Sequence, residues 1–160
     1  MTMKDPILPL EGHCRCGATR ISISAPPMLT AACHCTGCQR MSASAFSLSV
    51  AIPAEGFEVT QGSTVLGGAG RDRHHFCPEC LTWMFTRAPD LDSPDLDRFV
   101  NVRATLFIDT SWFVPFVETH MTDKLAWVPS VAPHSFIAVP SMEGYSRLIE
   151  DYAKAVGRRE

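Results

Sequence analysis

The feature that most limits what this chain can fold into is the grouping of its seven cysteines. Within a group they are spaced as C-x-C or C-x-x-C, whereas the groups lie far apart. Such spacing is typical of a metal held by thiolates, and the odd number argues against a disulfide framework. We therefore predict zinc or a similar soft-site metal. The groups are Cys14 with Cys16, Cys33 with Cys35 and Cys38, and Cys77 with Cys80.

Four of the cysteines can complete one site, which we call the quartet: Cys14, Cys16, Cys77 and Cys80. Four thiolates satisfy the tetrahedral coordination of a structural zinc ion. Because the two pairs are far apart in the sequence, zinc there would fasten an N-terminal strand to a hairpin over residues 73–86. We expect the quartet to be structural only.

The other three, Cys33, Cys35 and Cys38, supply only three ligands and are called the trio. His34 and His120 are candidate fourth ligands, although an extended segment would point His34 away from its cysteine neighbours. An open fourth position is typical of catalytic zinc. Zinc with three thiolates has a net charge of −1, which suits an incoming thiol better than the generation of hydroxide. A second structural site, closed by a distant residue, is the alternative.

Alternation of apolar and polar residues predicts a mainly β fold. In an extended strand, residues two apart share a face, so we expect Cys14 and Cys16 to face one side of a strand edge. The same reasoning places Cys33 and Cys35 on one face. The expected strands are 19–24, 29–35, 45–52, 57–60, 63–66, 73–76, 82–86 and 98–102.

Two helices are expected. A short one over 39–44 follows the trio, and an amphipathic one over 141–157 has apolar residues every three or four positions and Ser141 as its cap. Residues 1–11 are predicted to be a loose lead-in and residues 88–97 a solvated loop.

Composition narrows the possible partners. The chain has 160 residues, 46% of them hydrophobic and 19% charged, which predicts a single domain over 1–160. A net charge of −3 gives no electrostatic reason to expect nucleic acid or an anionic membrane as a partner. The sequence shows neither an export signal nor a membrane span, so we expect a cytoplasmic protein with reduced thiols. It leaves the oligomeric state open.

Three motifs follow one another in the chain: Gly12-x-Cys14-x-Cys16-Gly17, Cys33-His34-Cys35-x-x-Cys38-Gln39-Arg40-x-Ser42 and Phe76-Cys77-Pro78-x-Cys80. Downstream of them lies the segment His120-x-x-x-Lys124-x-x-Trp127. In this order the motifs resemble those of the glutathione-dependent formaldehyde-activating enzyme family, which also includes centromere protein V, and the downstream segment is similar to the C-terminal part of that family. The resemblance covers residues 12–127.

The resemblance implies a β-tent-like zinc-binding fold, related to methionine sulfoxide reductase B and to Rab-binding zinc proteins. It implies structural zinc in the quartet and catalytic zinc in the trio, hence two ions per chain. The implied activity is that of a carbon–sulfur lyase, which joins formaldehyde to glutathione as S-(hydroxymethyl)glutathione. Glutathione would be the co-substrate, so small thiols and aldehydes are the expected partners.

The remaining residues carry weaker signals. The family usually has glycine after the second knuckle cysteine, where this chain has Leu81, so we expect a strained backbone there. His34 is a candidate proton shuttle or a structural hydrogen-bonding residue. Arg40 and Lys124 are candidates for binding the carboxylates of glutathione, or are ordinary surface charges. The three tryptophans, Trp83, Trp112 and Trp127, are predicted to lie in the core.

Two other functions are possible. A non-enzymatic, zinc-stapled binding module would have a closed second site and an exposed apolar patch. An enzyme like methionine sulfoxide reductase would need a nucleophilic cysteine outside the metal sites, and the quartet and the trio already use all seven. The carbon–sulfur lyase is the function we predict. The sequence specifies neither the true aldehyde nor the true thiol.

Overall fold

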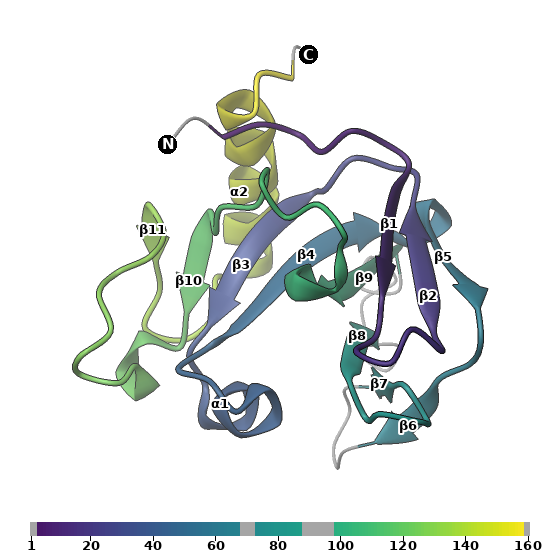
Figure 1. The fold of residues 1–160 in the computed structure, drawn as a ribbon. Coiled ribbons are helices and arrows are strands. Elements are labelled where there is room, and N and C mark those ends of the chain that lie inside the picture. Colours follow the sequence, from purple (N-terminus) through teal and green to yellow (C-terminus); the bar gives the residue numbers. More distant parts are fainter. Residues whose placement is uncertain (1–2, 68–72, 88–97, 159–160) are drawn as a thin grey trace.

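The computed structural model describes residues 3–67, 73–87 and 98–158, and these form a mainly β protein with two α-helices (Figure 1). The predicted fold class is confirmed in that respect. The described strands form two sheets. The smaller is antiparallel in the order β1-β2-β5, with β1 at Leu10–His13, β2 at Arg20–Ile23 and β5 at Phe57–Gln61.

The larger sheet has the order β11-β10-β3-β4-β9-β8-β7-β6. Strand β10 runs parallel to β3 and to β11, and the other neighbours in the sheet are antiparallel. The hairpin predicted over 73–86 is formed by β7 and β8. The strands are β3 Leu29–Cys33, β4 Ser47–Pro53, β6 Val65–Gly67, β7 Arg73–Phe76, β8 Trp83–Arg87, β9 Phe99–Arg103, β10 Val117–Thr119 and β11 His134–Ser135.

The C-terminal helix α2, Met142–Ala155, begins where the sequence predicts. The Ser141 hydroxyl accepts a hydrogen bond of 3.1 Å from the backbone N–H of Gly144, which satisfies one free donor of the first turn. Leu148 and Tyr152, four residues apart, are buried on one face of the helix. The other helices are α1 Thr36–Ser42 and the short 3-10 turns η1 Ala54–Gly56, η3 Ala104–Leu106 and η4 Met121–Asp123.

The apolar residues gather in two cores. The larger core lies between the sheets and joins inward residues of β1 and β2 to those of β4, β8 and β9. The smaller core seats α2 against β3 and β10, through Leu29, Val117, Leu148 and Tyr152 among others. Across the residues that the model describes, no helix is both long and apolar enough to pass through a membrane.

Three local predictions are wrong. Cys14 and Cys16 lie in a tight turn after β1, closed by a hydrogen bond of 3.0 Å from the N–H of Gly17 to the carbonyl of Cys14. Strand β3 ends at Cys33, and α1 begins at Thr36, three residues before the expected start of that helix. The reason is that Cys35 acts as the helix N-cap, so it leaves the strand geometry we assumed. Finally, the lead-in is shorter than expected, because β1 begins at Leu10.

The segments around 57–60 and 63–66 are strands, but they belong to different sheets: β5 pairs with β2, and β6 pairs with β7. The acidic loop predicted over 88–97 lies outside the described residues.

Candidate metal centre

The quartet is assembled from two turns. Cys14 and Cys16 come from the turn after β1, and Cys77 and Cys80 from the turn that joins β7 to β8. The four Sγ atoms all lie within 4.8 Å of one another, with 3.4 Å between those of Cys14 and Cys16 and 3.9 Å between those of Cys16 and Cys77. Tetrahedral zinc with Zn–S bonds of ~2.3 Å would separate its sulfurs by about 3.8 Å. The four sulfurs therefore fit a zinc ion.

Polar groups surround the quartet and support thiolates. The backbone N–H of Thr19 donates to the Sγ of Cys14 at 3.3 Å. The hydroxyl of Thr82 lies 3.1 Å from the Sγ of Cys80, and this hydrogen bond lowers the pKa of Cys80 to about 5. A thiolate is the form of cysteine that binds zinc, so these hydrogen bonds favour metal binding.

Leu81 has the backbone conformation that the sequence suggested. Its φ is +56°, in the left-handed region, and its N–H donates to the carbonyl of Cys77 at 3.0 Å to close the turn. The side chain is 70% exposed, so it makes little packing contact that would offset the strain.

The trio lies where β3 meets α1. Cys33 is the last residue of β3, Cys35 is the helix cap and Cys38 lies in the first turn of α1. Their Sγ atoms are within 4.8 Å of one another, and all three residues are partly exposed. Among the residues with described positions, no histidine or carboxylate joins this cluster. The described residues therefore offer three soft sulfurs at this site and no fourth histidine, cysteine or carboxylate ligand.

Hydrogen bonds within the trio favour the thiolate form of Cys33 and the thiol form of Cys38. The bond from Cys38 lowers the pKa of Cys33 to about 5, with help from the hydroxyl of Thr119. The same bond raises the pKa of Cys38, while the hydroxyl of Ser47 acts in the opposite direction. The backbone N–H of Cys38 donates to the Sγ of Cys35 at 3.3 Å.

Arg103, at the end of β9, is a buried cation that the sequence gave no reason to single out. It donates to the hydroxyl of Ser47 at 3.4 Å and to the carbonyl of Asn101 at 3.1 Å. Its guanidinium carbon lies 4.0 Å from the ring centroid of Trp83. Burial lowers the pKa of Arg103 to about 10, although the charges of Cys38 and Cys33 raise it.

His34 is fully buried, and it is not among the described residues whose ligand atoms cluster in the trio. Its Nε2 lies 3.3 Å from a carboxylate oxygen of Glu118, and Phe46 packs edge-on against its ring. Its Nδ1 has no hydrogen-bond partner among the residues with described positions. This arrangement favours the structural role of His34; its role as a proton shuttle stays a prediction. His120, the other histidine considered as a fourth ligand, has φ +57° at the start of η4.

Glu118 is a second buried charge that sequence reasoning missed. Its carboxylate accepts hydrogen bonds from the hydroxyls of Ser130 and Ser135 and from the N–H of Val131. Burial raises the pKa of Glu118, but these hydrogen bonds outweigh it and hold the pKa below its ordinary value. A sequence signal did exist, because Glu118 interrupts the apolar segment 113–119.

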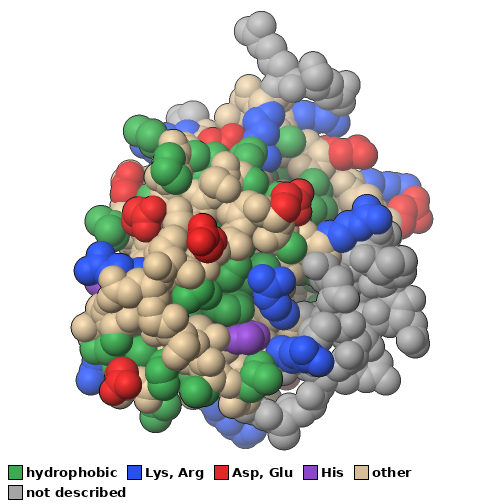
Figure 2. Space-filling model, turned by 90° about the vertical axis from the view of Figure 1, so that its right-hand side faces the viewer, with side chains coloured by type: hydrophobic (Ala, Val, Ile, Leu, Met, Phe, Trp, Pro, Cys, Tyr) green, Lys and Arg blue, Asp and Glu red, His purple; other side chains and the backbone are tan. Residues whose placement is uncertain are grey.

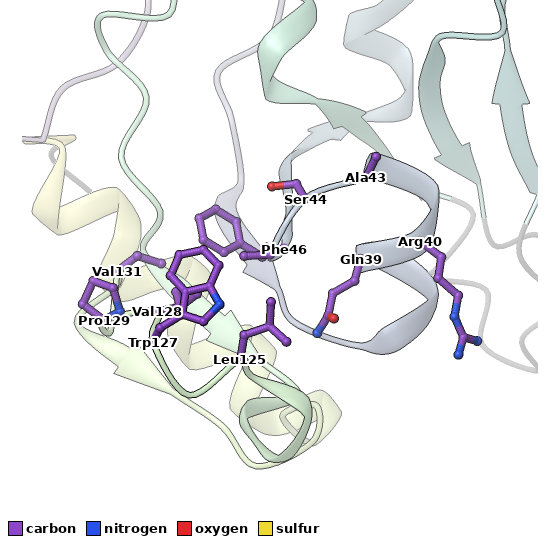
Figure 3. A pocket seen from close by; sticks show the side chains of 11 residues that line it. Gln39, Arg40, Ala43, Ser44, Phe46, Leu125, Trp127, Val128, Pro129 and Val131 are labelled. Atoms are coloured by element: carbon purple, nitrogen blue, oxygen red, sulfur yellow. The ribbon is translucent and has the colours of Figure 1, made fainter.

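Beside α1 a groove of about 850 Å³ runs along residues 125–131 (Figure 3). It is mostly apolar, with Phe46 and Trp127 among its lining. Trp127 is 76% exposed, so the prediction that it belongs to the core is wrong, whereas Trp83 and Trp112 are buried as expected. Figure 3 shows the segment that carries Trp127 across the groove from α1.

The two candidate glutathione-binding cations differ in their surroundings. Arg40 is exposed and extends from the side of α1 that faces away from Trp127 (Figure 3). Lys124 is half-buried, and its ammonium donates to the carbonyl of Val128. On the face drawn in Figure 2, acidic and basic side chains are interspersed, and no extended basic patch is seen there.

Comparison with known proteins gives a family match that covers both cysteine clusters. No curated protein matches the sequence. A solved structure from Rhodobacter sphaeroides shares 15% identity with the chain, covers 79% of it and 98% of its own length, and has a TM-score of 0.49. The family model of the glutathione-dependent formaldehyde-activating enzyme matches residues 9–123, a range that contains the quartet and the trio. On that match, the chain belongs to the glutathione-dependent formaldehyde-activating enzyme family.

Proposed function

We propose that this protein is a carbon–sulfur lyase or ligase that joins a small aldehyde to glutathione or a similar thiol. One observation carries the proposal: three thiols meet within 4.8 Å with no fourth protein ligand among the described residues, while a separate group of four is complete. The match to the formaldehyde-activating family supports the same chemistry.

The donor chemistry of both clusters fits zinc, because all seven ligand atoms are sulfur and zinc accepts four of them tetrahedrally. Zinc in the trio would supply a positive centre that accepts a substrate thiol as thiolate. The protein's own part is to hold Cys33, Cys35 and Cys38 together at the β3–α1 junction and to leave the fourth direction accessible.

The reaction balances without an oxidant or reductant. A bond forms between the thiol sulfur and the carbonyl carbon, the thiol loses its proton, and the carbonyl oxygen gains one. The reverse reaction breaks the same carbon–sulfur bond. All seven cysteines are free thiols in the structure, which fits our proposal that the protein works in a reducing compartment such as the cytoplasm.

The best candidate to hold a carboxylate of glutathione is Arg40. It is exposed and lies on α1, the helix that also carries Cys38, and no ion pair among the described residues competes for its charge. Lys124 is the weaker candidate, since its ammonium is already hydrogen-bonded to Val128.

The direct test measures zinc content together with the rate at which formaldehyde and glutathione form S-(hydroxymethyl)glutathione. We expect two zinc ions per chain and a rate well above the uncatalysed reaction. Cys35→Ala should keep one zinc ion and reduce the rate to the uncatalysed level, while Thr36→Ala, the exposed neighbour, should leave both unchanged. Two zinc ions in the wild type with no acceleration would exclude the proposed activity.

The role of Arg40 is tested separately. Arg40→Ala should raise KM for glutathione several-fold with kcat nearly unchanged, because an ion pair with a distant carboxylate contributes to ground and transition states alike. Arg147→Ala, which removes an exposed arginine of α2, is the control. An unchanged KM would leave Arg40 as an ordinary surface charge.

A zinc-stapled binding module is the second candidate function. The groove beside α1 favours it, because the exposed Trp127 and Leu125 form part of an apolar surface of the kind that partners cover. The open trio argues against it, since a module needs no free coordination position. The rate measurement above separates the two candidates.

A further inference from the structure

Arg103 is buried, yet it forms no ion pair with any carboxylate among the described residues. Only 8% of the residue is exposed, and its hydrogen bonds go to a neutral hydroxyl and a neutral carbonyl. Its Nε has no hydrogen-bond partner within the described part of the chain. Taking a guanidinium out of water without a counter-charge costs several kilocalories per mole, so a buried arginine normally lies beside an anion.

The strand register shows which anion it faces. Cys33 is opposite Ser47 across the β3–β4 pair, and Arg103 is opposite Ser49 across the β4–β9 pair. Ser47 and Ser49 are two residues apart on β4, so their side chains share a face of the sheet. Residues directly opposite each other also share a face, so Cys33 and Arg103 lie on the same side of the sheet with β4 between them.

The Ser47 hydroxyl links the cation to the trio. It accepts a hydrogen bond of 3.4 Å from Nη1 of Arg103 and is itself hydrogen-bonded to Cys38. Cys38 and Cys33 both raise the pKa of Arg103, as anions close to a cation do.

The guanidinium is also held in place. Trp83 lies beneath it at 4.0 Å from the ring centroid, and the carbonyl of Asn101 accepts from Nη2. The indole of Trp83 is itself buried. A planar cation stacked on a buried ring has little freedom to turn toward solvent, so its charge is fixed relative to the trio.

We propose that Arg103 is the fixed counter-charge of the trio, a positioning residue whose buried cation strengthens metal binding by Cys33, Cys35 and Cys38. The inference rests on the proposed function only in taking the trio to be a metal site. Three thiolates on a divalent metal give a net charge of −1, and a substrate thiolate makes it −2. One guanidinium nearby, itself buried, offsets one of these charges.

The experiment compares the two metal sites within each variant. Zinc-loaded wild type, Arg103→Met, Arg103→Lys and Arg87→Met are titrated with a zinc chelator, and native mass spectrometry counts the zinc ions retained. Alkylation of the released thiols, mapped by peptide, shows whether the trio or the quartet has lost its metal. Arg87 is the matched control, because it also lies over a ring, that of Phe57, but at the end of β8 and outside both cysteine clusters.

We expect Arg103→Met to weaken the trio for zinc by about tenfold or more, which is the effect typical of residues that support metal ligands. The quartet should keep its affinity in the same molecule. Arg103→Lys should recover most of the loss because it restores the charge, and Arg87→Met should behave as the wild type. Cobalt in the trio provides a second readout: its sulfur-to-metal absorption should move to lower energy in Arg103→Met.

Equal zinc affinity of the trio in Arg103→Met and wild type would overturn the inference. So would a loss in Arg103→Lys as large as in Arg103→Met, which would show that shape rather than charge matters. If Arg103→Met does not fold, Arg103→Gln replaces it, with the same expectation and the same overturning result. A wild-type trio that binds no zinc at all would instead refute the proposed function.

Discussion

The quartet and the trio are both built from cysteines, but they differ in how their cysteines are brought together and in how far these are exposed. The quartet draws its four cysteines from two turns that belong to different sheets, and Cys14 and Cys77 are fully buried. The trio draws three cysteines from one continuous segment of six residues, all partly exposed. A ligand set that spans distant segments constrains the fold, whereas one that is local in sequence leaves the fold nearly unchanged if its metal is lost.

The quartet and the trio also differ in the polar and charged groups that surround them. Around the quartet, neutral hydroxyl and N–H groups satisfy the sulfurs, as at Thr19 and Thr82. Around the trio lie a buried cation, Arg103, and a buried His34–Glu118 pair. Buried charges are costly and are often kept where a site needs them, which supports our proposal that the trio is the reactive site.

The largest expected effect is a loss of stability, because we expect zinc in the quartet, but not zinc in the trio, to be needed for folding. Cys77→Ser removes one quartet ligand, and zinc in small modules contributes on the order of 10 kcal/mol to folding. We therefore expect this variant to lose most of its stability, measured by circular dichroism and urea unfolding with zinc analysis. The matched variant Cys38→Ser should lose one zinc ion and still fold. Similar stability of the two variants would remove the contrast drawn above.

Glu118 tests whether the trio side contains its own buried polar network. Glu118→Ala leaves two serine hydroxyls and His34 without their acceptor, and should cost about 3 kcal/mol of unfolding free energy. Glu118→Gln, which keeps the shape, should cost about 1–2 kcal/mol. Urea unfolding at pH 7 measures both, and Glu143→Ala on the exposed face of α2 is the control. A cost below that of the control would mean that the network adds no stability.

The same carboxylate predicts a pH dependence. The folded pKa of Glu118 lies below the ordinary value of 4.5, so the unfolded chain takes up the proton more readily. Above pH 4.5 the free energy of unfolding of the wild type should exceed that of Glu118→Gln by the full difference expected at neutral pH. This difference in free energy of unfolding should shrink as the pH falls below 4.5 and passes through the lowered pKa of folded Glu118. Unfolding of both proteins at matched zinc content checks this, and a constant difference down to pH 3 would contradict it.

Leu81 offers a smaller effect at the quartet. With φ at +56° and an exposed side chain, Leu81→Gly should relieve backbone strain and raise stability by about 0.5–1 kcal/mol. Leu81→Ala is the control, because alanine has the same Cβ clash and should bring no gain. Thermal unfolding of the zinc-loaded proteins distinguishes them. An equal gain for both would point to the side chain rather than the backbone.

The smallest effect concerns the groove on the trio side. Trp127→Ala should change stability by no more than about 0.5 kcal/mol, because the indole is already in water. Trp112→Ala, at a buried position of the larger core, should cost about 3 kcal/mol or more. Urea unfolding measures both variants. A large loss for Trp127→Ala would mean that the loop at 125–131 depends on this ring.

Much of the local structure could be predicted from the sequence. The hairpin that carries Cys77 and Cys80 and the C-terminal helix capped by Ser141 both appear as expected. The errors occur where a cysteine does something other than continue a strand. Cys35 caps α1 instead, and Cys14 enters a turn, because side-chain hydrogen bonds and turn geometry compete with alternation there.

The sequence by itself determined the two sets of thiol donors that could hold a metal, and the family, because cysteine spacing and donor type are local properties that a single chain displays. The tertiary structure alone decided which distant residues surround those sulfurs. Arg103 and Glu118 read as ordinary charges in the sequence, yet both are buried, since the register across β3, β4 and β9 and the pairing of β10 carry them inside. Register depends on long-range pairing of strands, which no local pattern encodes.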